Sequence, residues 1–223
     1  MRRLLLVPLL AVGLAACGGS GHGKATLWIT RDEGHTVLLA AQVPAGETAM
    51  QALERSATVS TRYGGRFVQS VNGLAGSISS EHDWFYFVNG IEGTSGAVEY
   101  RLRPGDVEWW DYRDWGTAGE TVPVVVGAFP EPFLHGFGGR VRQAVVIGPG
   151  ARGADAVAKV IHGRVAASAP RDANVLRLLP PFSGPPRFTA RLRPGGGVVF
   201  DYTGDPRRLA RDPGLARYRY RLP

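Results

Sequence analysis

The chain has 223 residues, and its 26 basic residues outnumber its 19 acidic residues, which gives a net charge of +7. With 44% hydrophobic and 20% charged residues, the composition fits one or two folded domains and excludes a collagen-like or wholly disordered protein. The single cysteine, Cys17, excludes disulfides within the chain, cysteine-based zinc sites and iron–sulfur clusters.

The first 17 residues have the pattern of a secretion signal. Arg2 and Arg3 precede an apolar stretch, residues 4–16, that is too short to span a bilayer as a helix. Residues 14–16 and Cys17 resemble a bacterial lipobox, in which the cysteine receives a diacylglyceryl group and becomes the first residue of the mature protein. An ordinary signal peptide with an incidental cysteine is the alternative. We therefore expect a signal peptide over residues 1–17, a flexible tether over residues 18–24 and a lipid anchor on the extracytoplasmic face of the cell membrane.

Charge divides the rest of the chain into two halves. Residues 18–120 contain 8 basic and 13 acidic residues, whereas residues 121–223 contain 16 basic and 6 acidic residues. The change falls at a run of mostly small residues, 116–120, just after a cluster of aromatic residues. We therefore expect one domain over residues 25–116 and a second, basic domain over residues 121–223.

The first half is expected to contain two strands, one short helix and further strands. Thr48 and Gln51 have the spacing of a capping box, with which the helix begins. Asn72-Gly73 and Asn89-Gly90 each end a strand and are typical of two-residue hairpin turns. Strands are predicted at residues 25–30, 36–43, 59–63, 66–71, 84–88, 97–102 and 107–112. This order predicts an α+β fold of the β-grasp type, with the helix across one face of a mixed sheet.

The second half predicts another small α+β domain. Asp205 before Pro206 is typical of the start of a short helical turn. The other elements are a helix at residues 154–161 and strands at residues 122–126, 141–147, 174–179, 188–192, 198–202 and 218–222.

The first half resembles the transcobalamin-like C-terminal domain family over about residues 25–115. The matching residues lie on the helix, the aromatic strand with its Asn-Gly turn, the Pro-Gly-Asp turn and the strand after it; they include Thr48, Met50, Leu53, Phe67, Val71, Asn72, Gly73, Trp84, Tyr86, Asn89, Gly90, Tyr100, Pro104, Gly105, Asp106, Trp109 and Tyr112. In transcobalamin this module closes over cobalamin from one side, while a helical barrel, which this chain lacks, holds the other side. The resemblance implies cobalamin or a related small molecule as ligand, and vitamin capture for a membrane transporter.

Six large aromatic residues lie on the later strands of the first half and just after them. Neighbouring residues of a strand point to opposite faces, so Trp109 and Trp110 cannot both lie in one core. We predict that some of the rings are exposed as a platform for a ringed ligand or are covered by the second half. Asn89 would shape the adjoining turn or donate a hydrogen bond to the ligand. The candidate stacking residues are Trp84, Tyr86, Trp110 and Tyr112.

An apolar, proline-rich loop follows the expected boundary, at residues 129–137. A loop of this composition is either packed between the halves or presented to a partner. If the loop is packed against the aromatic strands, the cleft between the halves is the expected pocket.

The sequence predicts no catalytic residues, no metal ligands and no cofactor. Glu81, His82 and Asp83 are adjacent and point in different directions, which is typical of a turn rather than a metal site. We identify no nucleophile elbow, and no glycine-rich phosphate loop between a strand and a helix. The favoured interpretation is a non-enzymatic ligand-binding module, followed by an envelope protein that binds a protein or polymer, and then by an uncharacterised enzyme.

The arginines of the second half indicate an anionic partner. Anionic lipid or an envelope polymer is a candidate, the acidic first half is another, and a solvated edge that resists aggregation is the alternative. Nucleic acid is not expected outside the membrane. The arginines concerned are Arg187, Arg191, Arg193, Arg207, Arg208, Arg211, Arg217, Arg219 and Arg221.

Overall fold

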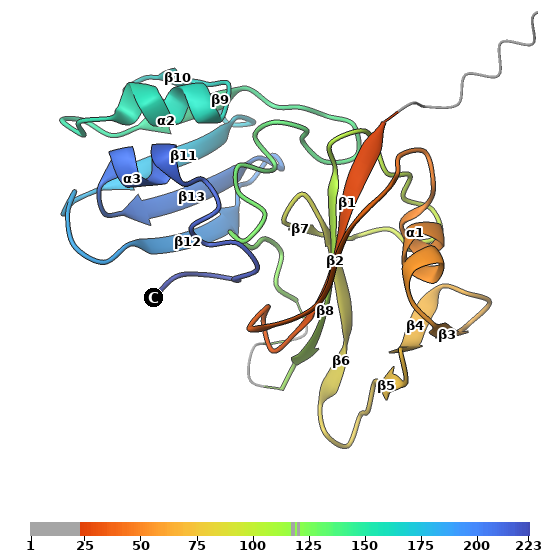
Figure 1. The fold of residues 1–223 in the computed structure, drawn as a ribbon. Coiled ribbons are helices and arrows are strands. Elements are labelled where there is room, and N and C mark those ends of the chain that lie inside the picture. Colours follow the sequence, from red (N-terminus) through yellow and green to blue (C-terminus); the bar gives the residue numbers. More distant parts are fainter. Residues whose placement is uncertain (1–22, 117–118, 120) are drawn as a thin grey trace, which may run out of the picture.

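The computed structural model describes residues 23–116, 119 and 121–223 (Figure 1). Its chain forms two α+β units, each built on a five-stranded sheet. The predicted signal peptide, the lipidation residue Cys17 and most of the tether lie outside the described residues, as do three residues of the expected boundary at 116–120. Among the described residues, no helix is long and apolar enough to cross a membrane.

The N-terminal unit has the predicted β-grasp arrangement. Its sheet is mixed: β1 pairs in parallel with β8, while the other neighbours pair antiparallel. The helix α1 (Ala49–Ser56) lies across one face of this sheet (Figure 1). The strand order is β2 (Thr36–Pro44), β1 (Lys24–Arg31), β8 (Val107–Asp114), β6 (His82–Val88) and β7 (Ile91–Glu92). A separate three-stranded sheet follows α1 and consists of β3 (Val59–Arg62), β4 (Phe67–Val71) and β5 (Leu74–Ala75).

The capping box at the start of α1 is confirmed. The Thr48 hydroxyl accepts a hydrogen bond from the Gln51 amide at 3.1 Å, and the Gln51 side chain accepts one from the Thr48 amide at 2.9 Å. These bonds satisfy backbone N–H groups that a helix N-terminus otherwise leaves unpaired. The buried face of α1, which includes Met50 and Leu53, packs on the sheet in one cluster with Trp110.

The strand predicted at residues 97–102 is wrong. Residues 97–99 form a turn, and only Arg101 makes an isolated bridge. The carbonyls of Ala97 and Tyr100 instead accept hydrogen bonds from the Met50 and Ala49 amides, at 3.0 and 2.9 Å. The segment therefore pairs with the first turn of α1, whose N–H groups need acceptors, and not with a strand.

Both Asn-Gly turns are confirmed as two-residue hairpin loops. Val71 pairs with Leu74 across Asn72-Gly73, and Val88 pairs with Ile91 across the second turn. The φ angles are +50° and +82° in the first turn and +53° and +75° at Asn89 and Gly90. Positive φ at both positions is what this turn type requires.

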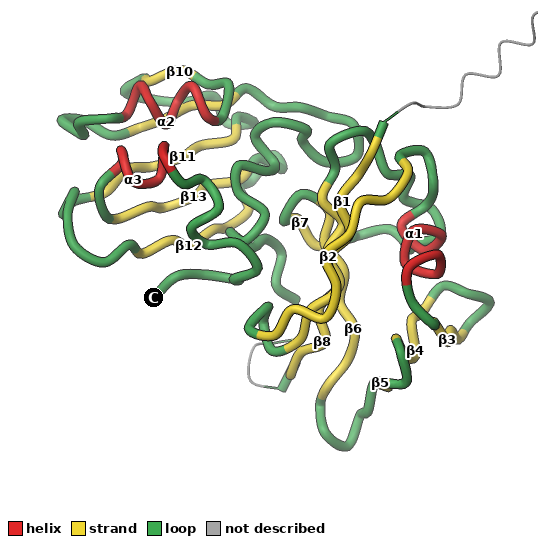
Figure 2. The backbone as a smooth tube through the Cα atoms, viewed as in Figure 1, coloured by secondary structure: helices red, strands yellow, loops and turns green. Residues whose placement is uncertain are grey.

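The C-terminal unit is a mainly parallel sheet with two short helices, α2 (Ala154–Val160) and α3 (Pro206–Arg211). Figures 1 and 2 show both helices on the same side of the sheet. Four neighbouring strands of the sheet run parallel to one another, and the strand at one edge is antiparallel to its neighbour. The order is β10 (Arg164–Val165), β9 (Ala144–Ile147), β11 (Asn174–Leu179), β13 (Val198–Thr203) and β12 (Arg187–Leu192).

Two strands predicted in this half, at residues 122–126 and 218–222, are wrong. Each segment makes only one isolated bridge, Val124 to Ile91 and Leu222 to Phe188. The two segments instead run beside each other between the units, where the Val126 amide donates to the Tyr220 carbonyl at 3.1 Å. Val125 and Tyr220 are buried in this contact, and alternation in the sequence does not show which segment will cover a residue.

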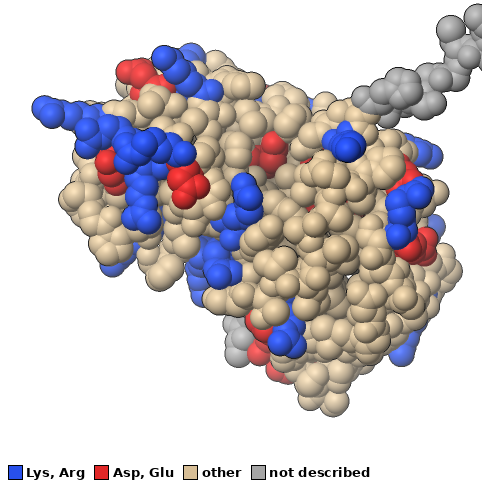
Figure 3. Space-filling model, in the orientation of Figure 1, with Lys and Arg blue, Asp and Glu red and all other residues tan. Residues whose placement is uncertain are grey.

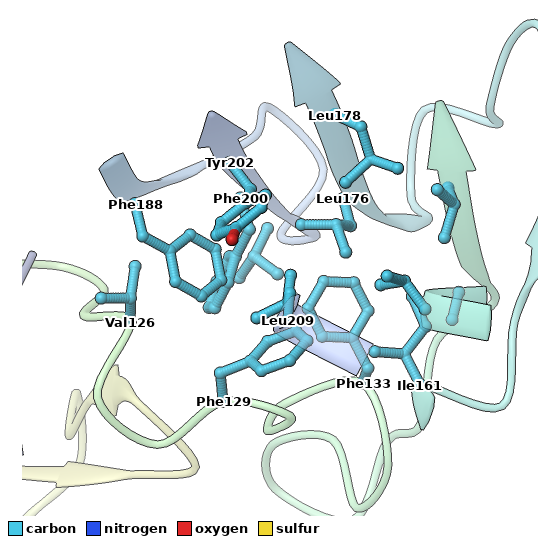
Figure 4. Packing of buried hydrophobic residues seen from close by; sticks show 14 of the residues in the cluster. Val126, Phe129, Phe133, Ile161, Leu176, Leu178, Phe188, Phe200, Tyr202 and Leu209 are labelled. Carbon is cyan, nitrogen blue, oxygen red and sulfur yellow. The ribbon is translucent and has the colours of Figure 1, made fainter. Parts of the chain in front are cut away.

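The proline-rich loop is packed inside the protein. Phe129 and Phe133 enter the core of the C-terminal unit, where Figure 4 shows them facing Phe188, Phe200 and Leu209. This agrees with the packed alternative for residues 129–137, because the rings are sealed among other aromatic and aliphatic side chains.

The second unit covers the sheet face opposite to α1. Trp109 lies on that face and is fully buried; its ring stands edge-on to Tyr220, with centroids 5.5 Å apart. Val125 and Ala128 belong to the same cluster. Trp109 and Trp110 therefore point to opposite faces as predicted, and both faces are covered.

Candidate functional site

Two of the predicted stacking residues, Trp84 and Trp110, lie in the core beneath α1. Their exposed fractions are 6% and 3%. Each indole N–H is also used within the protein: Trp84 Nε1 donates to the Leu74 carbonyl at 2.9 Å, and Trp110 Nε1 donates to Glu108 Oε1 at 2.6 Å. In this structure the two indoles have almost no surface left for a ligand.

The other two, Tyr86 and Tyr112, are partly exposed. Tyr86 stacks on Trp110 with centroids 5.1 Å apart, and its hydroxyl donates to the Ser95 carbonyl. Burial raises the pKa of Tyr86 to about 12. The Tyr112 hydroxyl donates to the Ala75 carbonyl at 3.0 Å. The two hydroxyls thus bond to the loop at Ser95 and to strand β5, and both rings are part-buried.

Asn89 is fully buried and its amide is used within the protein. Its Nδ2 donates to Asp106 Oδ1 at 2.8 Å and to the Gly136 carbonyl at 2.7 Å. Its Oδ1 accepts from the Val107 amide at 2.8 Å. Asp106 also accepts from the Arg103 amide, as expected of a Pro-Gly-Asp turn. Asn89 therefore shapes its turn and links the two units through Gly136.

An accessible hollow of about 500 Å³ lies at the tip of the three-stranded sheet, and we call it the hairpin groove. It lies between the turn that joins β3 to β4 and the loop that precedes β6. Its lining residues are Arg62, Tyr63, Phe67, Gln69, Gly76, Ser77, Ile78, Ser79 and Asp83.

Three apolar side chains of the hairpin groove face solvent. Ile78 is 87% exposed, Tyr63 is 79% exposed and Phe67 is 38% exposed. The rings of Tyr63 and Phe67 meet edge-on, with centroids 6.3 Å apart. Exposed apolar side chains gathered around one hollow are typical of a binding surface, whereas isolated ones are common on any protein.

Polar groups, among them Arg62 and Asp83, also line the hairpin groove. Asp83 Oδ1 accepts from the Trp84 amide at 2.8 Å, and burial raises the pKa of Asp83 while the nearby Arg62 opposes that rise. Trp84 and Tyr112 lie next to the groove. They donate hydrogen bonds to the carbonyls of Leu74 and Ala75 in β5, which directly precede the lining residue Gly76. The predicted residues thus adjoin the groove without forming its accessible surface.

The exposed residues of the groove were not among the candidates from sequence. A signal was present: Tyr63 precedes Gly64-Gly65, so a large aromatic residue stands at the tip of a tight hairpin. A hairpin tip has no second layer to bury such a ring.

The expected cleft between the units takes the form of two separate hollows. One, of about 420 Å³, is lined by residues that include Glu33, Thr189, Tyr220 and Arg221. The other, of about 260 Å³, has mainly apolar walls that include Ile91, Phe137 and Leu192. The loop over residues 129–137 lines only the second of these hollows, through Pro132, Gly136 and Phe137.

Residues 148–153 form a glycine-rich loop that was not predicted. Gly148, Gly150 and Gly153 have the spacing G-x-G-x-x-G, and the structure places them directly after β9 and before α2. A glycine-rich loop therefore does follow a strand into a helix. The spacing was visible in the sequence, and the expected strand at residues 141–147 and helix at residues 154–161 already placed it between a strand and a helix.

Within the described part of the chain, no group of three or more His, Cys, Asp or Glu residues could hold a metal ion. His82 begins β6, and its Nδ1 lies 2.5 Å from the Ser80 carbonyl. Glu81 forms part of the turn before it, with a φ of +53°. The segment of Glu81, His82 and Asp83 is thus a turn that leads into a strand.

One family model matches this chain, over residues 46–114, and its description is "Domain of unknown function (DUF4430)". The match begins just before α1 and ends with β8, so it lies inside the N-terminal unit and covers less than a third of the chain. A search of the curated proteins found no match.

The solved structures that resemble part of the chain include two proteins. One is haptocorrin in complex with Cbi, with 16% identity and a TM-score of 0.35; the match covers 40% of this chain and 24% of haptocorrin. The other is a proposed metal-binding protein from Ruminococcus gnavus, with 14% identity and a TM-score of 0.36; the match covers 41% of this chain and 97% of that protein. The chain thus spans about a quarter of haptocorrin, and similarities this distant carry no information about a ligand.

Proposed function

We propose that the protein is a lipid-anchored, extracytoplasmic module that binds a small molecule in the hairpin groove and has no catalytic activity. Residues 25–116 and 121–223 would be its two domains. The observation that supports this function is the gathering of Tyr63, Phe67 and Ile78, all exposed, around one hollow. A ligand that covers large exposed apolar side chains removes their surface from water, and this burial favours binding.

The groove fits a ligand with a flat, apolar face and a polar edge. Tyr63 and Phe67 offer ring surfaces, while Arg62 and Asp83 offer a cation and a carboxyl group at the same hollow. The resemblance of the N-terminal half to the transcobalamin-like family makes cobalamin, or a related ringed molecule, the ligand to test first. A groove open on one side also leaves a face for a second protein, which would be the transporter that receives the ligand.

Cobalamin should bind the full chain in detergent saturably at micromolar concentrations, with a shift of the corrin absorbance. Tyr63→Ala and Ile78→Ala are each expected to weaken binding by about tenfold, because each removes apolar surface worth about 1.5 kcal/mol or more. Leu38→Ala is the matched control, since Leu38 is an exposed aliphatic residue on β2, outside the groove. Absence of a saturable change excludes corrinoids, and an equal loss in Leu38→Ala excludes the groove as the site.

The lipid anchor has its own test. Cys17→Ala removes the thiol that would carry the diacylglyceryl group, so we expect the variant to leave the membrane fraction and to lose incorporation of labelled fatty acid. Wild-type protein should resist extraction by salt and yield to detergent. Full retention of Cys17→Ala in the membrane, with labelled fatty acid still attached, would contradict the anchor.

A further inference from the structure

We propose that the C-terminal unit binds a phosphate-bearing ligand in a crevice at the carboxyl ends of its parallel strands, with Arg152 and Arg207 as the anion contacts. This crevice is a hollow of about 280 Å³. Its lining residues are Gly150, Arg152, Phe182, Asp205, Pro206 and Arg207.

The position of the crevice follows from the topology of the sheet. Gly150 and Arg152 come from the loop after β9, Phe182 from the loop after β11, and Arg207 from the segment after β13. These three strands are adjacent and parallel. In open sheets of parallel strands, ligands bind in the crevice outside the carboxyl ends, because the loops that leave several strands converge there.

Two of the three glycines of the loop let another group approach closely, and the third lies beside open space. A Cβ at Gly148 would lie 2.8 Å from the Leu178 Cβ, so this glycine allows the loop to pack on β11. A Cβ at Gly153 would lie 2.6 Å from the Arg207 Cγ, so this glycine allows the arginine to reach the crevice. Gly150 differs from both: its φ is +74° and no other group lies within 4 Å of its Cβ position. Its backbone is therefore open to a ligand.

The charge of the crevice favours an anion. Arg152 is exposed and makes no ion pair with any described residue, and the only carboxylate in the lining is that of Asp205. Asp205 Oδ1 accepts from the Arg207 amide at 2.9 Å and from Arg207 Nε at 3.1 Å, so it is already paired and it orients Arg207. Figure 3 shows Lys and Arg side chains gathered over the α2 and α3 side of this unit. Guanidinium groups bind phosphate oxygens through paired hydrogen bonds.

The ligand class is therefore a phosphate or diphosphate group, either free or at the end of a larger molecule. A dinucleotide and a phospholipid headgroup share this chemistry. The site lies in the other unit from the hairpin groove and shares no residue with it. Binding here is thus independent of the function proposed for the groove.

Titration of the full chain with inorganic pyrophosphate, followed by calorimetry, tests the site. We expect saturable binding that Arg152→Gln and Arg207→Gln each weaken by about tenfold, because each removes a charged hydrogen-bond donor worth about 1.5 kcal/mol or more. Arg66→Gln removes the same charge from an exposed position on the hairpin of the other unit and should leave binding unchanged. Tyr63→Ala should also leave it unchanged, which separates this site from the groove.

Two competition experiments distinguish the sources of the phosphate. If pyrophosphate displaces bound NAD, the larger ligand is a dinucleotide. If pyrophosphate displaces bound vesicles of phosphatidylglycerol, the larger ligand is a lipid headgroup. Absence of heat up to millimolar pyrophosphate would overturn the proposal. An equal loss of affinity in Arg66→Gln would overturn it too, because the attraction would then belong to the net charge of the chain and not to the crevice.

Discussion

Asn89→Ala is expected to lower the free energy of unfolding by about 4 kcal/mol, and Asn72→Ala by about 1 to 2 kcal/mol. Both residues occupy the first position of an Asn-Gly turn, and both have φ near +50°. The strain of placing alanine at positive φ is therefore common to both variants. The difference between them therefore measures the buried hydrogen bonds of Asn89 against the one exposed bond of Asn72.

The side-chain hydrogen bonds of the two asparagines differ in number and in burial. Asn89 loses its bonds to Asp106, Gly136 and Val107, all buried or part-buried, and the groups left behind cannot turn to water. Asn72 loses one exposed bond, in which its Oδ1 accepts from the Thr58 amide at 2.9 Å. Urea unfolding of the two variants beside the wild type measures the difference. Equal losses would show that Asn89 acts only through its turn and not as a link between the units.

Asp111→Asn is expected to flatten the pH dependence of stability. Asp111 is fully buried on the sheet face that meets the C-terminal unit, where it accepts hydrogen bonds from the Thr30 hydroxyl and, at 3.1 Å, from the Gly34 amide. Burial is the largest influence and raises the pKa of Asp111 to about 6, against the opposing effect of these bonds. The folded protein therefore binds a proton at this carboxyl more tightly than the unfolded chain does.

The sign of the effect follows from proton linkage. Between the unfolded pKa of about 4 and the folded pKa of about 6, the folded state holds more protons, so stability falls as the pH rises. Tighter proton binding at Asp111 stabilises the folded state by about 3 kcal/mol below a pH of about 4. This stabilisation is lost as the pH rises through about 6. Asparagine does not titrate, and its side-chain oxygen can still accept hydrogen bonds from Thr30 and Gly34. The stability of the variant should therefore not fall with rising pH through this site.

Chemical unfolding of both proteins between about pH 4 and pH 7.5 measures this difference. Burial also raises the pKa of Glu108, Asp106 and Glu131, so some decline should remain in the variant, and the change in decline is the quantity to compare. Asp155→Asn is the control, because Asp155 is an exposed residue of α2. An unchanged decline in Asp111→Asn would contradict the buried carboxyl as its source.

Local signals in the sequence predicted those elements whose bonds close within a few residues. The capping box joins Thr48 to Gln51, and each Asn-Gly turn joins residues three apart, so neither depends on the rest of the chain. The hairpins, α1 and the alternating strands around them were enough to predict the β-grasp arrangement. The short helix after Asp205 was predicted for the same reason, since Asp205 caps it and Pro206 begins it.

Apolar alternation was a poorer guide where burial comes from a distant segment. Residues 122–126 and 218–222 were predicted as strands, yet their buried residues, such as Val125 and Tyr220, are covered because they lie between the units. The sequence indicated that Trp109 and Trp110 must face opposite ways. It also predicted a helix across one face and left open whether rings are exposed or covered by the second half; in the structure α1 covers one face and the C-terminal unit the other, which removes both indoles from solvent.

The candidate sites were decided by the tertiary structure. In the sequence, Asn72 and Asn89 both begin an Asn-Gly turn, Tyr63 precedes a Gly-Gly turn, and the glycines at 148, 150 and 153 lie between an expected strand and an expected helix. None of these patterns shows what packs around the residue. Folding exposes Tyr63 and Ile78 around one hollow, buries Asn89 against Gly136, and places the glycine loop beside Arg207. The physical reason is that turn geometry and strand alternation are set by neighbours in the chain, whereas burial and the shape of a pocket are set by which distant segments pack together.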